Sequence, residues 1–173
     1  YPPNYQNLPA VLKALEAETA GYVGAGFDLL KIKIGLLPLE QDLERIRVIR
    51  ETIGPSIGIM VDANHGYNAG NAVRMGHMMA PFDVRFFEEP VPPEDRDGYR
   101  KVRAEVPIPI AGGECEFTRY GFRDFIGGGC VDIVQPDIAA CGGLTAFTQI
   151  LTLANTYGVA TVPHVWGSGV AVT

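Results

Sequence analysis

Short apolar runs alternate along the chain with longer stretches in which apolar residues recur at every third or fourth position. The runs have the length of strands, and the spacing in the longer stretches is that of amphipathic helices. We predict strands at 27–34, 57–61, 84–87, 108–111, 131–136 and 159–163. We predict helices at 10–20, 39–53, 69–80, 94–105, 117–126 and 144–157. Strands and helices that alternate in this way indicate a parallel α/β fold.

Three acidic residues end successive predicted strands at a regular interval. Asp62, Glu88 and Glu114 each follow an apolar run, and each is 26 residues from the next. Equivalent positions of a repeated strand–loop–helix unit lie at the same end of the sheet, and the carboxyl ends of barrel strands carry active sites. Converging carboxylates repel one another unless a cation lies between them, and their hard oxygens favour Mg²⁺, with Mn²⁺ possible. We therefore predict a metal site, although separate helix N-caps would also place acids there.

Two lysines end the first predicted strand. Alternation of side chains places Lys31 and Lys33 on one face of this strand and Ile32 on the other. A buried strand rarely carries lysine. Two adjacent ammonium groups disfavour each other, so one pKa should fall toward neutrality, as a general base requires. The alternative is an exposed edge strand that the lysines protect from pairing.

A carboxylate and an imidazole end the last two predicted strands. Asp137 and His164 would lie on neighbouring strands, within reach of a hydrogen bond. Such a bond fixes the tautomer of the ring and raises the basicity of its other nitrogen.

Three further polar residues follow the strands that carry acids. Asn64 shares a face with Asp62 if the strand geometry continues, and would then contact the same ligand. We expect Glu89 to point away from Glu88 and to pair with a lysine. His65 is open to two interpretations, as a ligand contact or as a satisfied loop residue.

Composition limits the cell compartment and the class of partner. The chain of 173 residues is 47% hydrophobic, which allows a packed core, and its net charge is −6 without a basic cluster. These features argue against nucleic acid as a partner, and no apolar run has membrane-spanning length. The three cysteines, Cys115, Cys130 and Cys141, are odd in number and lack metal-type spacing. We expect reduced thiols in a cytoplasmic protein that binds neither nucleic acid nor membrane.

The length is short for the predicted fold. At about 26 residues per unit the 173 residues hold between six and seven units, whereas a closed (β/α) barrel has eight. We expect residues 1–173 to form one partial TIM-type barrel domain, incomplete at both ends.

In combination, the strand-end motifs resemble the enolase superfamily, in its mandelate racemase/muconate lactonizing enzyme group. The motifs are Lys-Ile-Lys at 31–33, Asp-Ala-Asn at 62–64, Glu-Glu-Pro at 88–90, Gly-Gly-Glu at 112–114, Gln-Pro-Asp at 135–137 and Pro-His at 163–164. The resemblance extends over essentially the whole chain. The longer stretches at 62–67, 87–91 and 162–167 look like those of acid-sugar dehydratases and sugar-lactone cycloisomerases within this group.

The resemblance implies a modified enolase-superfamily barrel and a role for each motif residue. It assigns Mg²⁺ to Asp62, Glu88 and Glu114. Lys33 would be one acid/base catalyst, assisted by Lys31, and His164 with Asp137 would act on the opposite face of the substrate. It implies substrate contacts by Asn64, His65 and Trp166. The superfamily's α+β capping domain is absent from this chain, and its eighth-strand position would lie beyond Thr173.

These roles imply an isomerase or lyase of sugar acid catabolism. We expect Mg²⁺-dependent abstraction of the proton α to the carboxylate of a sugar acid or its lactone, through an enediolate. β-Elimination would follow, as dehydration or lactone ring opening. The alternatives are a racemase or epimerase of a 2-hydroxy acid with the same residues, a non-catalytic metal-binding barrel fragment, and a phosphate-binding barrel. By family analogy the protein would be a homo-oligomer with a small-molecule carboxylate as substrate.

Overall fold

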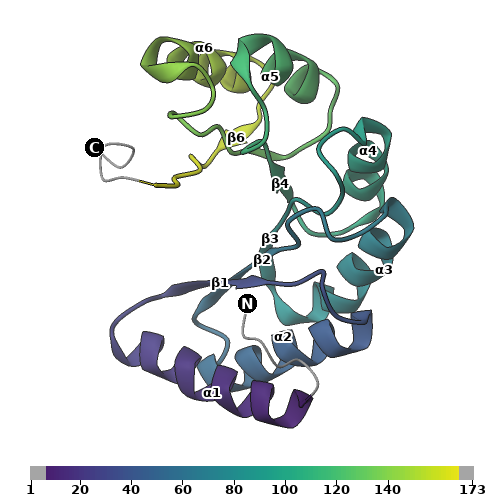
Figure 1. Cartoon of the computed structure of the whole chain (residues 1–173), viewed down its shortest axis with the longest axis vertical. Coiled ribbons are helices and arrows are strands. Elements are labelled where there is room, and N and C mark those ends of the chain that lie inside the picture. Colours follow the sequence, from purple (N-terminus) through teal and green to yellow (C-terminus); the bar gives the residue numbers. More distant parts are fainter. Residues whose placement is uncertain (1–6, 168–173) are drawn as a thin grey trace.

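The computed structural model describes residues 7–167, which form a single curved sheet with helices on its outer side (Figure 1). Its strands are β1 (Leu29–Lys33), β2 (Gly58–Asp62), β3 (Val84–Glu88), β4 (Ile110–Gly112), β5 (Ile133–Val134) and β6 (Ala160–Thr161). Its helices are α1 (Leu8–Gly24), α2 (Leu39–Ile53), α3 (Ala69–Met79), the 3₁₀ turn η1 (Ala80–Phe82), α4 (Arg96–Glu105), α5 (Thr118–Gly127) and α6 (Gly143–Thr156).

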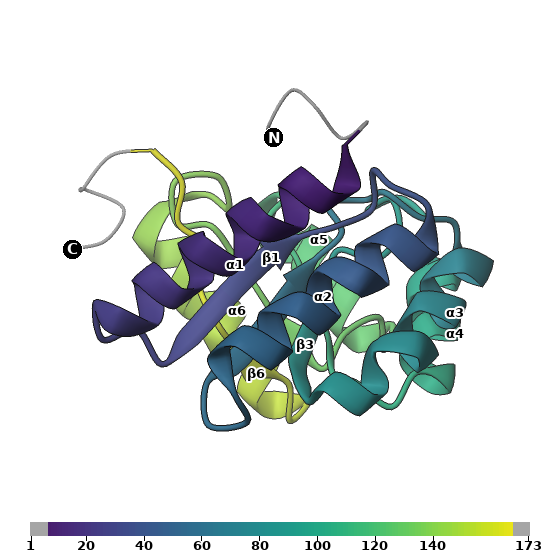
Figure 2. The ribbon, with the colours of Figure 1, turned by 90° about the horizontal axis from the view of Figure 1, so that it is seen from below.

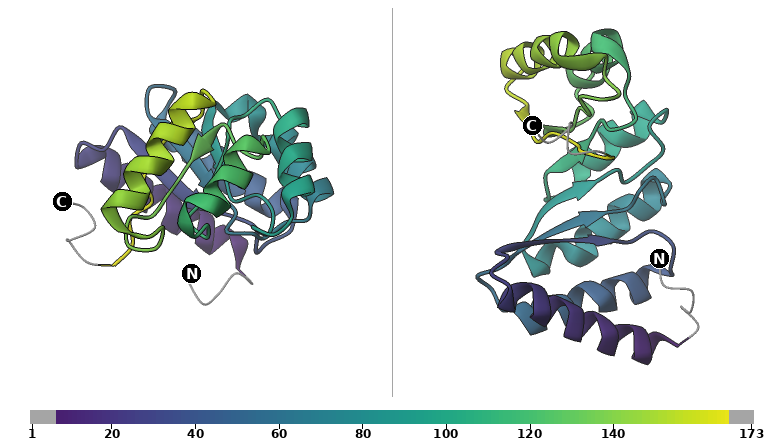
Figure 3. Two further views of the ribbon diagram at one scale, coloured as in Figure 1. Left: turned by 90° about the horizontal axis from the view of Figure 1, so that it is seen from above. Right: turned by 60° about the vertical axis from the view of Figure 1, so that its left-hand side comes forward.

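The six strands lie side by side in their order along the chain. Every neighbouring pair is parallel, from β1–β2 through to β5–β6. The sheet therefore follows an arc that is open on one side, as the right-hand view of Figure 3 shows. Parallel strands joined by helices put all carboxyl ends on one rim of that arc, so the predicted parallel α/β fold is confirmed.

The helices form a layer in which chain neighbours pack together. Helix α1 contacts α2, α3 contacts α4, and α5 contacts α6. Figure 2, seen from below, shows α1 and α2 lying side by side in front of the sheet. This layer covers the outer face of the curved sheet (Figure 1).

The core lies between the helices and the strands. Helix α2 turns Ile46, Ile49 and Ile53 inward, at the spacing of one helical face, onto strand residues that include Ile59 and Phe87. Each fully buried side chain of this size stabilises the fold by about 1.5–3 kcal/mol. The core therefore fixes each strand, and with it the position of each strand end.

Two helix ends show how local sequence sets the boundaries. Helix α2 has the predicted limits, since Gly54 follows it with a positive φ of 73° that favours glycine. Helix α3 stops at Met79, one residue before the predicted end, and Pro81 lies in the 3₁₀ turn that follows. Among residues 7–167, no helix combines the length and the apolar character needed to cross a membrane.

Candidate active site

A row of charged residues crosses the sheet at the carboxyl ends of its first three strands. Lys33 pairs in register with Asp62, and Asp62 pairs with Glu88. The pairing continues one residue further, because Ile34 N donates to Asp62 O at 2.8 Å and Ala63 N donates to Glu88 O at 3.0 Å. The parallel register thus gathers three residues from a stretch of sequence in which the first and the last are 55 positions apart.

Within this row the two lysines form ion pairs with two buried acids. Lys33 Nζ lies 2.5 Å from Asp62 Oδ2. Lys31 Nζ donates to both oxygens of Glu88, at 3.1 and 3.0 Å, and lies 3.5 Å from Asp62 Oδ2. Both acids are fully buried, whereas the lysine side chains are partly exposed. The edge-strand alternative accounts for the exposure of the lysines but not for their contacts with buried acids.

The pKa of Lys33 departs from its ordinary value in the direction opposite to the one predicted. Burial lowers the pKa of Lys33, but the hydrogen bond and charge of Asp62, together with the charges of Glu114 and Glu88, raise it by more. The predicted fall is therefore wrong for Lys33. Repulsion between two lysines would lower the pKa, but the fold also places carboxylates against them.

Glu88 has a pKa above its ordinary value. Burial is the main cause and the charge of Asp62 adds to it, while Lys31 and a hydrogen bond from Gln135 oppose the rise. Two adjacent buried carboxylates thus destabilise each other's charge, and positive charge beside them relieves the repulsion.

A second group joins the last two strands to β4. His164 Nδ1 lies 2.8 Å from Asp137 Oδ2, and His164 Nε2 lies 3.3 Å from Glu114 Oε2. A backbone hydrogen bond from His164 N to Pro136 O, at 3.2 Å, joins the segments that follow β5 and β6. Asp137 is fixed in turn, since its Oδ1 accepts from Ala139 N at 2.7 Å. The predicted bond between the carboxylate and the imidazole is confirmed, and it directs Nε2 toward Glu114.

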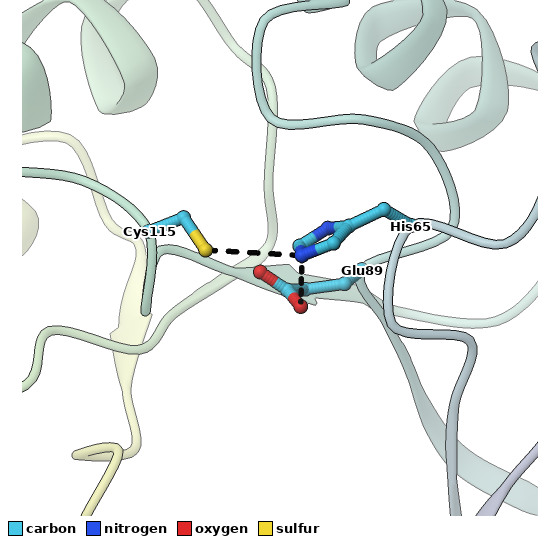
Figure 4. A group of neighbouring side chains, drawn as sticks. All are labelled: His65, Glu89 and Cys115. Atoms are coloured by element: carbon cyan, nitrogen blue, oxygen red, sulfur yellow. Dashed lines mark hydrogen bonds and ion pairs between the residues drawn. The ribbon is translucent and has the colours of Figure 1, made fainter.

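A third group lies in the loops that follow β2, β3 and β4 (Figure 4). Glu89 Oε2 accepts from Asn64 Nδ2 at 3.3 Å and lies 3.3 Å from His65 Nε2. Cys115 Sγ lies 3.8 Å from the same ring nitrogen. The expectation that Glu89 pairs with a lysine is therefore wrong. The residue has a positive φ of 43°, which interrupts the alternation of a strand, and its side chain is buried beside Asn64 and His65.

The pKa values in this third group reflect burial among like charges. Burial and the charge of Glu114 raise the pKa of Glu89 to about 8, against a smaller lowering by the hydrogen bond from Asn64. Burial, the charges of Glu89 and Glu114, and a hydrogen bond to Glu89 raise the pKa of Cys115 to about 11. The side chains after three successive strands therefore form one electrostatically coupled cluster.

The three acids predicted to bind metal are suited to a hard divalent cation by their chemistry. Asp62 Oδ2 is buried and, apart from its ion pairs with the lysines, accepts no hydrogen bond. In the described residues the three acids do not form a group whose ligand atoms all lie within 4.8 Å of one another. Each instead contacts a nitrogen, of Lys33, of Lys31 or of His164. Buried oxygen donors that compete for positive charge fit Mg²⁺, and their role as ligands stays a prediction.

A polar network that we did not predict from the sequence holds the end of β1. Asp42 Oδ2 accepts from Gly35 N at 2.8 Å and from the Tyr67 hydroxyl at 3.2 Å. Asp42 Oδ1 accepts from Arg45 Nη1 at 2.8 Å, and the same nitrogen donates to Lys33 O at 2.9 Å. The signal was present, because an acid and a base three residues apart occupy the buried face of α2. This network ties the helix to the backbone of the catalytic candidate Lys33.

The loops after β1 and β2 meet backbone to backbone. A Cβ at Gly35 would lie 2.7 Å from Ala63 O, and a Cβ at Gly66 would lie 2.6 Å from Gly35 O. Gly35 also has a positive φ of 96°. Both positions therefore require glycine for this approach.

The predicted substrate contacts differ in their surroundings. Asn64 and His65 both face Glu89, and His65 Nδ1 is buried without a hydrogen-bond partner among the described residues. Trp166 is 80% exposed. Their contact with substrate stays a prediction.

A parallel barrel-type sheet with acids, lysines and a histidine on its carboxyl rim defines the class of the protein. The chain belongs to the enolase C-terminal domain-like family, whose model matches residues 14–173. The resemblance and the partial-barrel fold predicted from the sequence are thereby confirmed.

Within this family the chain is similar to several individual enzymes. The chain is 48% identical over 156 residues to D-galactarolactone cycloisomerase of Agrobacterium fabrum, covering 90% of this chain and 41% of that protein. The crystal structure of the 3,6-anhydro-D-galactonate cycloisomerase from Zobellia galactanivorans has a TM-score of 0.91 and 47% identity, and covers 94% of this chain and 46% of its own. The crystal structure of L-talarate dehydratase from Polaromonas, complexed with Mg and L-glucarate, has a TM-score of 0.86 and 28% identity. The match covers 90% of this chain and 43% of that chain. The chain thus spans less than half the length of each.

Proposed function

We propose that the whole protein removes the proton α to the carboxylate of a sugar acid or its lactone in a Mg²⁺-dependent reaction, and then eliminates the β-oxygen. One observation carries this proposal. Two side chains able to transfer protons, Lys33 at the end of β1 and His164 after β6, stand at opposite ends of the described sheet. Each contacts an acid of the same rim, Asp62 or Glu114. A substrate carboxylate bound between them would have a proton-transfer group on either side.

The three strand-end acids would hold the metal. An α-proton is very weakly acidic because its loss puts a second negative charge on the substrate carboxylate. When bound by Asp62, Glu88 and Glu114, Mg²⁺ would supply positive charge that stabilises this developing charge. Lys31, which already contacts Glu88, would add a second positive charge on the same side.

The remaining residues handle the proton. Burial lowers the pKa of Lys33 but the contacts with Asp62 raise it by more, and a protonated Lys33 would suit a donor to the departing oxygen. His164 Nδ1 lies 2.8 Å from Asp137 Oδ2, and a proton on Nδ1 donated to this carboxylate would leave Nε2 to accept a proton. The pair therefore has the complementary acid and base roles that elimination requires.

The relatives favour elimination over racemisation. The names of the relatives above describe two cycloisomerases and a dehydratase. We propose dehydration or lactone ring opening for this protein, with Asn64, His65 and Trp166 as substrate contacts. Epimerisation of a 2-hydroxy acid by the same residues is the alternative, because a proton-transfer group on each face also permits inversion.

We also propose a cellular location, a partner and an oligomeric state for the protein. The three cysteines are free, which supports a cytoplasmic location. We propose a small-molecule carboxylate as its partner and a homo-oligomeric state by family analogy.

The test is a substrate screen of the whole protein with Mg²⁺. Hexarates, their lactones and aldonates are incubated in deuterated water and followed by NMR. Net formation of a dehydrated or ring-opened product, lost in Lys33→Met and in His164→Asn, supports the proposal. Exchange of the α-proton with inversion but no elimination would instead establish the epimerase. Turnover that is unchanged in both variants would leave these residues without a catalytic role.

A further inference from the structure

His65, Glu89 and Cys115 bring three different metal-binding atoms to one point (Figure 4). The ligand atoms, an imidazole nitrogen, a carboxylate oxygen and a sulfur, all lie within 4.8 Å of one another. Among residues 7–167 this is the one group of at least three such side chains that meets this distance. None of the three is among the acids assigned to Mg²⁺.

The separations fit a tetrahedral ion. Zn–N bonds of about 2.0–2.1 Å and Zn–S bonds of about 2.3 Å place neighbouring ligand atoms roughly 3.3 to 3.6 Å apart. In the structure His65 Nε2 lies 3.3 Å from Glu89 Oε2 and 3.8 Å from Cys115 Sγ. These two separations are within a few tenths of an ångström of the tetrahedral values, and all three ligand atoms lie within 4.8 Å of one another.

The fold holds these ligands in place from three strands. His65 N donates to Glu89 O at 2.9 Å, and Glu89 N donates to Ala111 O at 3.0 Å, so the three loops are linked through their backbones. Both His65 and Glu89 have positive φ, at 65° and 43°, and the backbone of residues other than glycine is strained there. Strained backbone of this kind is characteristic of sites where side-chain direction matters.

We propose that His65, Glu89 and Cys115 bind a thiophilic divalent cation such as Zn²⁺, with a water or a substrate oxygen in the fourth position. Sulfur and imidazole ligands select Zn²⁺ over Mg²⁺, which prefers oxygen alone. The site is separate from the three strand-end acids, although Glu89 follows Glu88 and Cys115 follows Glu114 in the sequence. It goes beyond the proposed function and does not depend on it.

The first test is spectroscopic. The whole protein is saturated with Mg²⁺, so that the oxygen-rich site is filled, and titrated with Co²⁺. We expect a sulfur-to-cobalt charge-transfer band that Zn²⁺ abolishes by displacement. Cys115→Ser should remove the band, and His65→Gln should weaken Co²⁺ binding at least about 10-fold, because each variant loses one of three ligands. Circular dichroism of each variant checks that it is folded.

Matched controls identify the ligands. Cys141→Ser and His77→Gln replace the same residue types elsewhere and should leave the band unchanged. Asp62→Asn should also leave it unchanged, which separates this site from the one in the proposed function. The inference is overturned if the wild-type protein shows no band, if the band survives Cys115→Ser, or if Asp62→Asn abolishes it.

A second measurement uses the unaltered protein. Cys115 is partly exposed, whereas Cys130 and Cys141 are buried. Zn²⁺ in the presence of excess Mg²⁺ should slow alkylation of Cys115 by iodoacetamide at least about 10-fold, because a metal-bound thiolate is shielded. Equal rates of alkylation with and without Zn²⁺ would contradict the site.

Discussion

The two halves of the sheet hold their functional candidates in different ways. Strands β1, β2 and β3 have five residues each, and they place Asp62 and Glu88 in full burial. Strands β4, β5 and β6 have three, two and two residues, and the side chains of Glu114 and His164 remain 19% exposed. In the first half a regular ladder sets the geometry, whereas in the second half loops and a few hydrogen bonds do so. Substitutions in the first half should therefore affect folding, and those in the second half mainly chemistry.

The largest effects on activity are expected at the two proton-transfer groups, of which each half of the sheet supplies one. Lys33→Met and His164→Asn should each lower kcat of the whole protein by roughly 10²- to 10⁴-fold, since general acid–base catalysis contributes about that much. Steady-state assays on the substrate found by the screen measure this. A large loss of kcat in both variants would support a role for both residues in the reaction. A loss in only one variant would contradict a proton-transfer role for the other residue.

The network behind β1 should be the most sensitive point for folding. Asp42→Ala leaves the Arg45 guanidinium buried without this carboxylate, which should cost about 3–5 kcal/mol of unfolding free energy. Lys101→Ala is the matched control, because its ion pair with Glu105 is exposed and should contribute less than about 1 kcal/mol. Urea unfolding followed by circular dichroism compares the two. Similar losses in both variants would contradict a special role for the buried network.

At the centre of the site, Glu89 should make stability depend on pH. Its folded pKa of about 8 exceeds the ordinary value of 4.5, so the folded state keeps a proton that the unfolded state releases. In metal-free protein this contribution is complete below pH 4.5 and is lost as pH rises toward about 8, by up to about 1.4 kcal/mol per unit. Glu89→Gln should remove this slope. Unfolding curves at pH 5, 7 and 9 with a chelator measure it, and parallel slopes for the two proteins would refute the assignment.

In the second half, Asp137→Asn should separate chemistry from folding. The imidazole of His164 would lose its charged partner, which should lower kcat by roughly 10- to 100-fold. Stability should change by less than about 1 kcal/mol, because an asparagine oxygen can still accept from Ala139 N. Activity and urea unfolding measured on the same preparation test both statements. A stability loss as large as that of Asp42→Ala would remove the contrast between the halves.

The repeated pattern of the sequence predicted the strands of the first half better than those of the second. The limits of α2 were correct because its apolar face and its final glycine are both local signals. The later strands are shorter than predicted: β4 begins at Ile110, after Pro109, and β5 ends at Val134, before Pro136. Proline lacks the N–H that a strand ladder requires, so these runs could not pair along their full length.

The candidate site was predictable where it depends on register and not where it depends on loops. Residues in phase along the strands, such as Asp62 and Glu88, had to meet once the sheet was parallel. The position of Glu89 could not be inferred, since a positive φ at a glutamate has no signal in the local pattern. The contact between His65 and Cys115 joins loops 50 residues apart, and strand periodicity carries no information on it.

The close approach of Gly35 and Gly66 has a consequence for attempts to change specificity. The segments after β1 and β2 share a seam that admits no side chain, so neither can be exchanged alone without displacing the other. A library that retains both glycines and varies the flanking positions together would preserve this seam. Grafts from a related enzyme should accordingly transfer the two segments as one unit.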